Sequence, residues 1–398
     1  MRRSRAMLVM TTSGEHIPPS HPQNEEVRSD QEIIDRKFMR AAIRLARKHE
    51  GLTAENPSVA ALVVKYFDEQ PVIIGRGVTA IGGRPHAEVL ALKEAGSAAK
   101  GAHVYVTLEP CSHFGKTPPC ADALIEAGVS RVVVAANDPD ERVSGRGFEK
   151  LRAARIEVIE NLLSQEAEYG LAGYLMRKRC VRPFVTLKMA MSKDGLIGAR
   201  DGRQIKITSE ISNGQVQVLR ALNDAILVGS STVQNDNPTL TCRLNGLNHR
   251  SPIRVVMDRN LGISPTSNLV QTAKQHKLIV ATNSDTSNSQ AYEEFGVEIL
   301  PNKTSDDYGQ ITELLDHLGK SDVSTLLVEG GAKIASSFLN AGYVDRIIIF
   351  QSEEELDVAA GTTTVKAPLT PENLPQGFLL KNKLTFGPDV MYEYEKIN

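Results

Sequence analysis

Four side chains suited to metal and acid–base chemistry lie in two short segments, one around His86 and one from Cys111 to Cys120. Glu88 follows His86 by two residues, and eight residues separate the two cysteines. One imidazole and two thiols suit tetrahedral zinc with its fourth position open to water. Because both segments must meet in space to form such a site, this pattern constrains the fold more than any other feature.

A His-x-Glu motif followed by Pro-Cys-x-x-Cys is typical of zinc deaminases acting on bases, and this chain departs from it only in the longer spacing between its cysteines. Zinc in such a site lowers the pKa of its water to about 7, and the glutamate transfers protons. We therefore predict His86, Cys111 and Cys120 as zinc ligands and Glu88 as the general acid/base. The alternative is a buried histidine, a surface glutamate and two core thiols, since free cysteine is often buried.

The composition excludes several classes of protein. The 46 Lys+Arg and 48 Asp+Glu residues give a net charge of -2, which does not indicate binding to nucleic acid or to a membrane surface. No apolar run approaches the roughly 18 residues that span a bilayer. Four cysteines among 398 residues do not make a disulfide framework. We expect a cytoplasmic enzyme with a small-molecule substrate and with no nucleic-acid or membrane partner.

Residues 1–30 are predicted to be a disordered tail. Their apolar run is shorter than a secretory signal requires, and the residues after it are rich in Pro, His, Asn and Glu.

The next part of the chain alternates strands and helices. This alternation predicts an α/β/α layered domain over residues 31–178. Both halves of the metal site would lie near helix starts, where a thiolate is favoured. Helices are predicted over 35–49, 86–95, 120–127, 147–155 and 166–176, and strands over 59–64, 72–78, 104–106 and 131–136.

A basic run and Arg182-Pro183 mark a break, and a second α/β domain is predicted over residues 179–398. Gly229 and Gly330-Gly331 follow strands, where backbone N–H groups can approach a phosphate. Residues 235–238 are predicted to be a plain turn. Strands are predicted over 184–191, 225–229, 253–257, 278–281, 325–328, 346–350 and 390–394, and helices over 332–339 and from a Thr208 or Ser209 cap through Leu222.

Each of three polar residues near the metal motif allows two interpretations of its role. Asn56 before Pro57 is either a turn residue or an amide that orients a substrate. His113 and Lys116, in the long loop between the cysteines, are either solvated or in contact with a substrate phosphate or ribose.

The chain closely resembles the bifunctional riboflavin-biosynthesis family, a pyrimidine deaminase fused to a reductase. The resemblance runs from Asp35 to the carboxyl terminus and is strongest in Asn56-Pro57, in residues 85–89 and in residues 105–120. It implies a cytidine-deaminase-like α/β/α domain followed by a dihydrofolate-reductase-like α/β domain. The implied cofactors are Zn²⁺ and NADPH.

The resemblance also implies two successive reactions. The first is zinc-dependent deamination of 2,5-diamino-6-ribosylamino-4(3H)-pyrimidinone 5′-phosphate. The second is reduction of the ribosyl group of 5-amino-6-(5-phosphoribosylamino)uracil to ribityl by NADPH. We expect a homo-oligomer.

Carried over position by position, the family pattern gives the zinc set already named, with Glu88 as proton donor. A guanidinium pair in the second domain, Arg220 and Arg243, suits a ribose phosphate. The implied substrate contacts are Asn56, His113 and Lys116 in the first domain and Arg220, Leu240, Arg243 and Glu329 in the second. The implied cofactor contacts are Ala190, Thr232, Asp236, Gly331, Ala332, Lys333, Ile334, Ala335, Ser336 and Ser337.

Three departures from the family pattern concern the second domain. Lys206 replaces a common tryptophan, Gln204 replaces a serine, and residues 351–356 replace an apolar run. They leave open an alternative in which the deaminase is active and the second domain binds without reducing. A nucleic-acid base deaminase is another alternative, but it needs a basic groove and stacking aromatics, and this chain has 5% aromatics and no Trp.

Overall fold

The computed structural model of the protein describes residues 29–115, 117–140, 142–199, 205–284, 289–356 and 362–397. Of the predicted tail over residues 1–30, the first 28 residues lie outside this description. The first helix, α1 (Asp30–Ala46), begins earlier than predicted because the Ser29 side chain caps it by accepting the Glu32 N–H.

The first domain is built on a five-stranded sheet in the order β2-β1-β3-β4-β5. Strands β3, β4 and β5 are parallel, and β1 is antiparallel to both of its neighbours. The strands are β1 (Ala60–Phe67), β2 (Gln70–Val78), β3 (His103–Leu108), β4 (Arg131–Ala136) and β5 (Glu157–Ile159). The remaining helices are α2 (Ala87–Ala95), α3 (Cys120–Glu126), α4 (Arg146–Ala153) and α5 (Ser164–Cys180), with 3-10 helices at Arg47–His49 and Gly96–Ala99.

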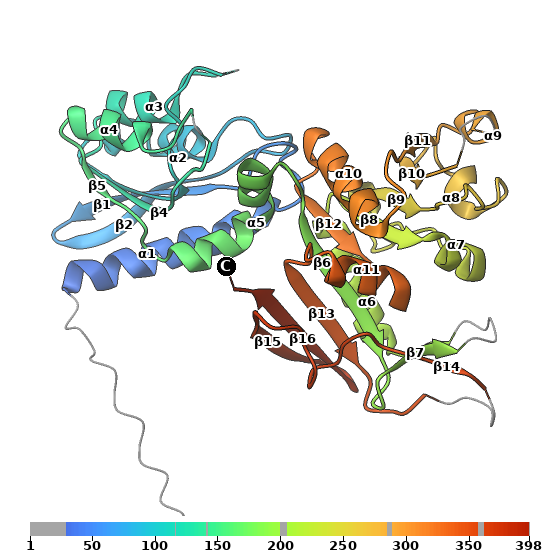
Figure 1. Cartoon of the computed structure of the whole chain (residues 1–398). Helices are drawn as coiled ribbons and strands as arrows, with labels where there is room; N and C mark the ends of the chain where they lie inside the picture. Colours follow the sequence, from blue (N-terminus) through green and yellow to red (C-terminus); the bar gives the residue numbers. More distant parts are fainter. Residues whose placement is uncertain are drawn as a thin grey trace, which may run out of the picture.

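Helices cover both faces of this sheet. Helices α1 and α5 lie on one face, and α2, α3 and α4 lie on the other (Figure 1). Strand β4 is buried along its whole length, as expected of a strand covered on both faces. The predicted α/β/α architecture is confirmed.

A buried ion pair ties α1 to this sheet. Arg131 on β4 donates to both carboxylate oxygens of Asp35, at 2.8 and 2.9 Å, and Tyr105 donates to the same carboxylate at 2.7 Å. Burial raises the pKa of Asp35, but hydrogen bonds from Arg131, Tyr105 and Gln31 outweigh it and hold the pKa below its usual 3.8. The carboxylate therefore stabilises the folded state when it is ionised.

We expect Asp35→Asn to lower the free energy of unfolding at pH 7 by about 3 kcal/mol, because Arg131 loses a buried partner. A lowered folded-state pKa gives stability that is present above the unfolded pKa and lost as pH falls through the folded pKa. The difference from wild type should therefore shrink below about pH 4 in urea titrations. Glu32→Gln, on the partly exposed face of α1, is the control; equal losses in both variants would contradict the prediction.

The second domain contains a nine-stranded sheet in the order β11-β10-β9-β8-β12-β6-β13-β16-β15 and a small sheet of β14 and β7. The strands are β6 (Phe184–Met191), β7 (Leu196–Ala199), β8 (Ala225–Gly229), β9 (Ile253–Met257), β10 (Leu278–Thr282), β11 (Glu298–Pro301), β12 (Thr325–Val328), β13 (Arg346–Gln351), β14 (Thr364–Lys366), β15 (Phe378–Phe386) and β16 (Asp389–Lys396). The helices are α6 (Glu210–Leu222), α7 (Ser230–Asp236), α8 (Asn268–Gln271), α9 (Gln290–Glu293), α10 (Asp307–Lys320) and α11 (Ala332–Asn340), with a 3-10 helix at Asn248–Arg250.

The seven strands from β11 to β13 are parallel, and β16 and β15 complete the sheet antiparallel. The carboxyl ends of parallel strands meet at one edge, where α/β proteins bind ligands. The second α/β domain is therefore confirmed. The predicted boundary at 178/179 falls inside the last turn of α5, which lies at the junction of the domains (Figure 1).

Gly229 lies at a strand-to-helix turn as predicted, because β8 ends there and α7 begins at Ser230. One local prediction needs correction. Residues 235–238 are not a plain turn, because Asn235 and Asp236 close α7 and only then does Asn237 turn the chain with a φ of 40°. Among the described residues, no helix is both long and apolar enough to cross a membrane.

Candidate active sites

The first site lies where two helix starts meet the end of a strand. His86 is the residue before α2, Cys120 opens α3, and Cys111 follows the end of β3 by three residues. The cis peptide bond Arg84–Pro85 immediately precedes His86. The two segments that are separate in the sequence thus lie at one edge of the first sheet.

The three predicted ligands converge. His86 Nδ1 lies 3.7 Å from Cys111 Sγ and 3.4 Å from Cys120 Sγ, and all three ligand atoms lie within 4.8 Å of one another. Zn–S bonds of about 2.3 Å and Zn–N bonds of about 2.1 Å in tetrahedral geometry place N and S about 3.6 Å apart. The donor atoms and their separations therefore fit zinc.

The electrostatics around the sulfurs favour a metal-binding thiolate. The Cys120 backbone N–H, at the start of α3, donates to Cys111 Sγ at 3.2 Å. Hydrogen bonds from the Cys120 thiol and from His86 lower the pKa of Cys111 to about 4, although burial opposes the shift. The same contact with Cys111, together with burial, raises the pKa of Cys120. A bound cation would deprotonate both thiols.

Glu88 lies in the first turn of α2, and only 4% of it is exposed. Burial, followed by the negative charge of Cys111, raises its pKa to about 7. A carboxyl group with a pKa near the working pH can both accept and release a proton. This property fits the predicted acid–base role.

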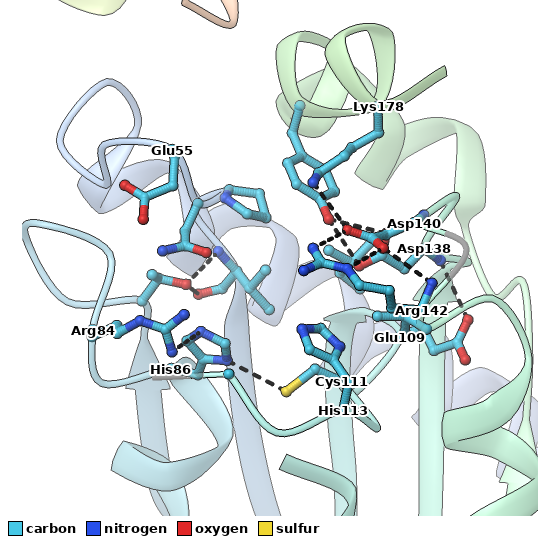
Figure 2. A pocket seen from close by; sticks show the side chains of 18 of the residues that line it. Glu55, Arg84, His86, Glu109, Cys111, His113, Asp138, Asp140, Arg142 and Lys178 are labelled. Carbon is cyan, nitrogen blue, oxygen red and sulfur yellow. Dashed lines mark hydrogen bonds and ion pairs between the residues drawn. The ribbon is translucent and has the colours of Figure 1, made fainter. Parts of the chain in front are cut away.

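A cavity of about 320 Å³ opens above these residues. Figure 2 shows Arg84 and His86 on one side of it and Asp138, Asp140 and Lys178 on the other. Its volume is within the range of small-molecule sites.

Two of the three predicted substrate residues in this domain line the cavity. Asn56 does so, with its side-chain amide donating to the Gly83 carbonyl at 3.3 Å. His113 lines it as well, from the loop between the cysteines. Lys116 lies outside the described residues.

The far wall of the cavity contains charged residues that sequence reasoning missed. Arg142 and Lys178 both pair with Asp140, at 2.6 and 2.9 Å, and hold its pKa well below the usual value. Burial raises the pKa of Asp138, which accepts the Tyr174 hydroxyl. The sequence contained a signal for this wall. Asp138 follows β4, which ends in register with β3, and β3 leads to Cys111, so Asp138 could be expected near the metal site.

The second site lies at the carboxyl ends of β12 and β6. Glu329 directly follows β12, whose last residue Val328 pairs with Leu187, so Glu329 lies near Lys188 on β6. Arg220 on α6 donates to both oxygens of Glu329, at 2.9 and 3.0 Å. Burial raises the pKa of Glu329, but the charges of Arg220 and Lys188 outweigh it and lower the pKa overall.

Lys188 is a residue of this site that the sequence prediction did not select. Burial lowers its pKa, and Glu329 opposes the shift. A single lysine within the apolar strand β6 was the available signal, since a lysine is rarely buried without a partner.

Next to this edge of the sheet, a cavity of about 630 Å³ lies at the amino terminus of α11. Gly331, which precedes the helix, has open space where a side chain would be, and Lys333 adds positive charge to the lining. Arg259 also lines the cavity, where it pairs with Asp307. A helix amino terminus with cationic side chains suits the phosphates of a dinucleotide. The residues present therefore fit NADPH.

The predicted cofactor run is only partly in contact with this cavity. Gly331, Ala332, Lys333, Ile334 and Ser337 line it. Ala335 instead faces the core, because it lies on the buried face of α11, and Ser336 is not among the lining residues.

The other predicted residues of the second domain are spread over several elements. Ala190 lies on β6, two residues after Lys188, and Thr232 and Asp236 lie on α7. Leu240 is buried with a φ of 55°, and the exposed Arg243 donates to Thr239 Oγ1 at 3.2 Å. Arg220 is already paired with Glu329, so a ribose phosphate would have to share it.

The departures from the family pattern have definite places. Lys206 is exposed and pairs with Glu210 one turn later, whereas Gln204 lies outside the described residues. In the 351–356 segment, the Glu354 carbonyl accepts the Lys193 N–H at 2.8 Å. This segment therefore packs against the turn after β6.

Two protein families match the chain, one in each domain. Residues 32–136 match the cytidine and deoxycytidylate deaminase zinc-binding region. Residues 183–352 match the RibD C-terminal domain. The first match contains all three candidate zinc ligands, and the second contains Lys188, Arg220 and Glu329.

Full-length relatives are similar across both domains. The riboflavin biosynthesis protein RibD of Aquifex aeolicus is 40% identical over 317 residues, which cover 80% of this chain and 86% of that protein. The structure is similar to Acinetobacter baumannii RibD, with a TM-score of 0.80, 32% identity, and coverage of 92% of this chain and 100% of that chain. It is also similar to a diaminohydroxyphosphoribosylaminopyrimidine deaminase/5-amino-6-(5-phosphoribosylamino)uracil reductase of Thermotoga maritima, with a TM-score of 0.79, 34% identity and the same coverage.

Proposed function

The chain belongs to the RibD family of bifunctional riboflavin-biosynthesis enzymes, and from this premise we propose that its two sites carry out two successive reactions. The protein is a zinc-dependent deaminase and an NADPH-dependent reductase. The first site removes ammonia from 2,5-diamino-6-ribosylamino-4(3H)-pyrimidinone 5′-phosphate. The second reduces the ribosyl group of the product to ribityl.

One observation carries the deaminase assignment: His86 Nδ1 and the sulfurs of Cys111 and Cys120 converge beside the buried Glu88. His86, Cys111 and Cys120 would hold zinc, which when bound supplies an activated water for attack on the ring. Glu88 takes one proton of the attacking water at its carboxylate and delivers it to the ring nitrogen, and it then takes the second proton and delivers it to the leaving amine. Asn56 and His113 orient the substrate from the cavity wall.

The reductase assignment rests on the strand ends around Lys188. The α11 amino terminus and Lys333 would hold NADPH, which supplies a hydride when bound. Lys188 Nζ holds the proton that accompanies reduction, and Glu329 and Arg220 fix its electrostatic environment. Arg243, which is exposed, is available to the substrate phosphate.

A coupled assay with the diaminopyrimidine phosphate tests both halves at once. Ammonia release without NADPH reports the deaminase, and NADPH oxidation after deamination reports the reductase, alongside zinc analysis. Ammonia without NADPH oxidation would leave only a binding role for the second domain. Cytoplasmic location and a homo-oligomeric state remain predictions, and sedimentation of the purified protein tests the second of these.

We expect Lys188→Met to lower the kcat/KM of the reductase on the order of 100-fold and to leave ammonia release unchanged. Burial lowers the pKa of Lys188 from its ordinary value of 10.5. As the pH rises, Lys188 therefore loses its proton at a lower pH than an ordinary lysine does. The rate of the wild-type reductase should therefore fall at a lower pH than an ordinary lysine would give, and this limb should vanish in the variant. Lys193→Met, at an exposed position, is the control; equal rates in wild type and Lys188→Met would refute the role.

A further inference from the structure

The second domain contributes to the wall of the deaminase cavity. Asp322, in the turn between α10 and β12, lines the same cavity as His86 and Asn56. Figure 1 shows α5 at the junction beside β12, and two residues near its carboxyl end, Arg177 and Lys178, also line the cavity. The deaminase cavity is therefore not complete within the first domain.

Arg177 connects the two domains through three separate contacts. Its side chain is only 9% exposed. Nη1 pairs with the Asp322 carboxylate, and Nε donates to Ser324 Oγ at 3.0 Å; both partners belong to the second domain. Nη2 donates to the Glu55 carbonyl at 2.5 Å in the first domain. One planar guanidinium group thus fixes the distance between two chain segments far apart in the sequence.

The Glu55 carbonyl belongs to the loop that presents Asn56 to the cavity, and Figure 2 shows Glu55 at the cavity rim. Within this loop the Asn56 N–H donates to the Thr53 carbonyl at 3.1 Å, and Thr53 Oγ1 donates to the Asn56 carbonyl at 2.6 Å. Arg250 of the second domain also donates to the Glu50 carbonyl, upstream of the same loop. Arg250 thus contacts the chain before this loop, whereas Arg177 contacts the loop itself, at the residue before Asn56.

Ser324, one of the second-domain partners of Arg177, is itself held firmly. The partly buried Asp224 carboxylate accepts the N–H groups of Ser324 and Thr325, at 2.8 and 3.0 Å. Helix α5 also packs closely here, because a Cβ on Gly173 would come within 2.6 Å of Thr325 Cγ2. The start of β12 is therefore a rigid anchor for the guanidinium group.

We propose that Arg177 is a positioning residue of the deaminase, through which the second domain holds the Asn56 loop against the substrate. This inference rests on the proposed deaminase function. It means that the reductase domain contributes to substrate binding at the zinc site, in addition to its own reaction. Loss of the Arg177 contacts should affect binding of the diaminopyrimidine phosphate more than the chemical step, because the described hydrogen bonds of Arg177 go to Asp322, Ser324 and the Glu55 carbonyl.

The test is Arg177→Met in the full-length protein, with ammonia release measured against concentration of the diaminopyrimidine phosphate. We expect KM to rise on the order of tenfold or more, with kcat, zinc content and reductase activity close to wild type. The matched control is Arg179→Met, two residues later on α5, where the arginine pairs with Glu168 instead. An unchanged KM in Arg177→Met, with active wild-type enzyme, would overturn the proposal, whereas inactive wild-type enzyme would refute the deaminase function itself.

A second variant separates positioning from direct substrate contact. Asp322→Ala with Ser324→Ala keeps Arg177 but removes its side-chain partners in the second domain. We expect KM to rise in this variant too. Adding Arg177→Met to it should have little further effect on KM, because both changes remove the same link between the second domain and the Asn56 loop. An unchanged KM, or fully additive effects, would mean that Arg177 acts on the substrate independently of the second domain. The KM of the double variant by itself remains informative if Arg177→Met does not fold.

Discussion

Replacing Glu88 by Gln is expected to lower kcat for ammonia release by about 100-fold to 10,000-fold, the range that general acid–base catalysis contributes. The amide cannot accept the proton that the carboxylate takes at neutral pH. Its size is nearly the same, so the buried position on α2 should still be filled. Zinc content and NADPH oxidation with the deaminated product should match wild type, because Glu88 is not a ligand and lies in the first domain.

Glu94→Gln is the matched control, because Glu94 lies on the same helix with its side chain 48% exposed. It should keep the wild-type rate of ammonia release. Near-normal turnover by Glu88→Gln would show that another group moves the proton. Loss of zinc in that variant would instead point to a structural role for Glu88.

Replacing Cys120 by Ser should remove zinc and, with it, deaminase activity. Loss of a contact outside the ligand shell already costs about 10- to 100-fold in metal affinity, so loss of a ligand should exceed this range. Chelation of the wild-type enzyme should have the same effect on ammonia release, and added zinc should restore it. NADPH oxidation with the deaminated product should persist in both cases, since the reductase site lies in the other domain.

Cys180→Ser is the control for a thiol outside the cluster, since Cys180 is exposed at the end of α5. It should keep both zinc and activity. Full zinc occupancy in the Cys120 variant, by elemental analysis, would exclude this sulfur as a ligand. If chelation also abolished NADPH oxidation, the reductase reaction would depend on the metal of the first domain.

Local sequence patterns were sufficient for the helix starts that form the metal site. Helices begin at Ala87 and Cys120 because the residues before them end loops and the apolar spacing after them is helical. Spacing between strand and helix also predicted two α/β domains. Such patterns depend on neighbours within a few residues, which is why the sequence alone carries them.

The sequence did not predict helix α7 or the ion pair between Arg220 and Glu329. Residues 230–236 have weak helix propensity in sequence, and the packing of Val233 in the core stabilises the helix there. Arg220 and Glu329 are separated by 109 residues, and their pairing depends on how α6 docks against β12. Propensity and spacing contain no information about such a distance.

The sequence by itself determined the chemistry of the zinc set, because the residue types and their spacing limit the ligands to one kind of metal site. Only the tertiary structure decided what surrounds that set: the acidic and basic wall formed by Asp138, Asp140 and Arg142, and the approach of Asp322 and Arg177 to the Asn56 loop. The physical reason is that ligand identity is a property of single side chains. Cavity walls, in contrast, arise from contacts between segments that meet only when sheets and helices pack.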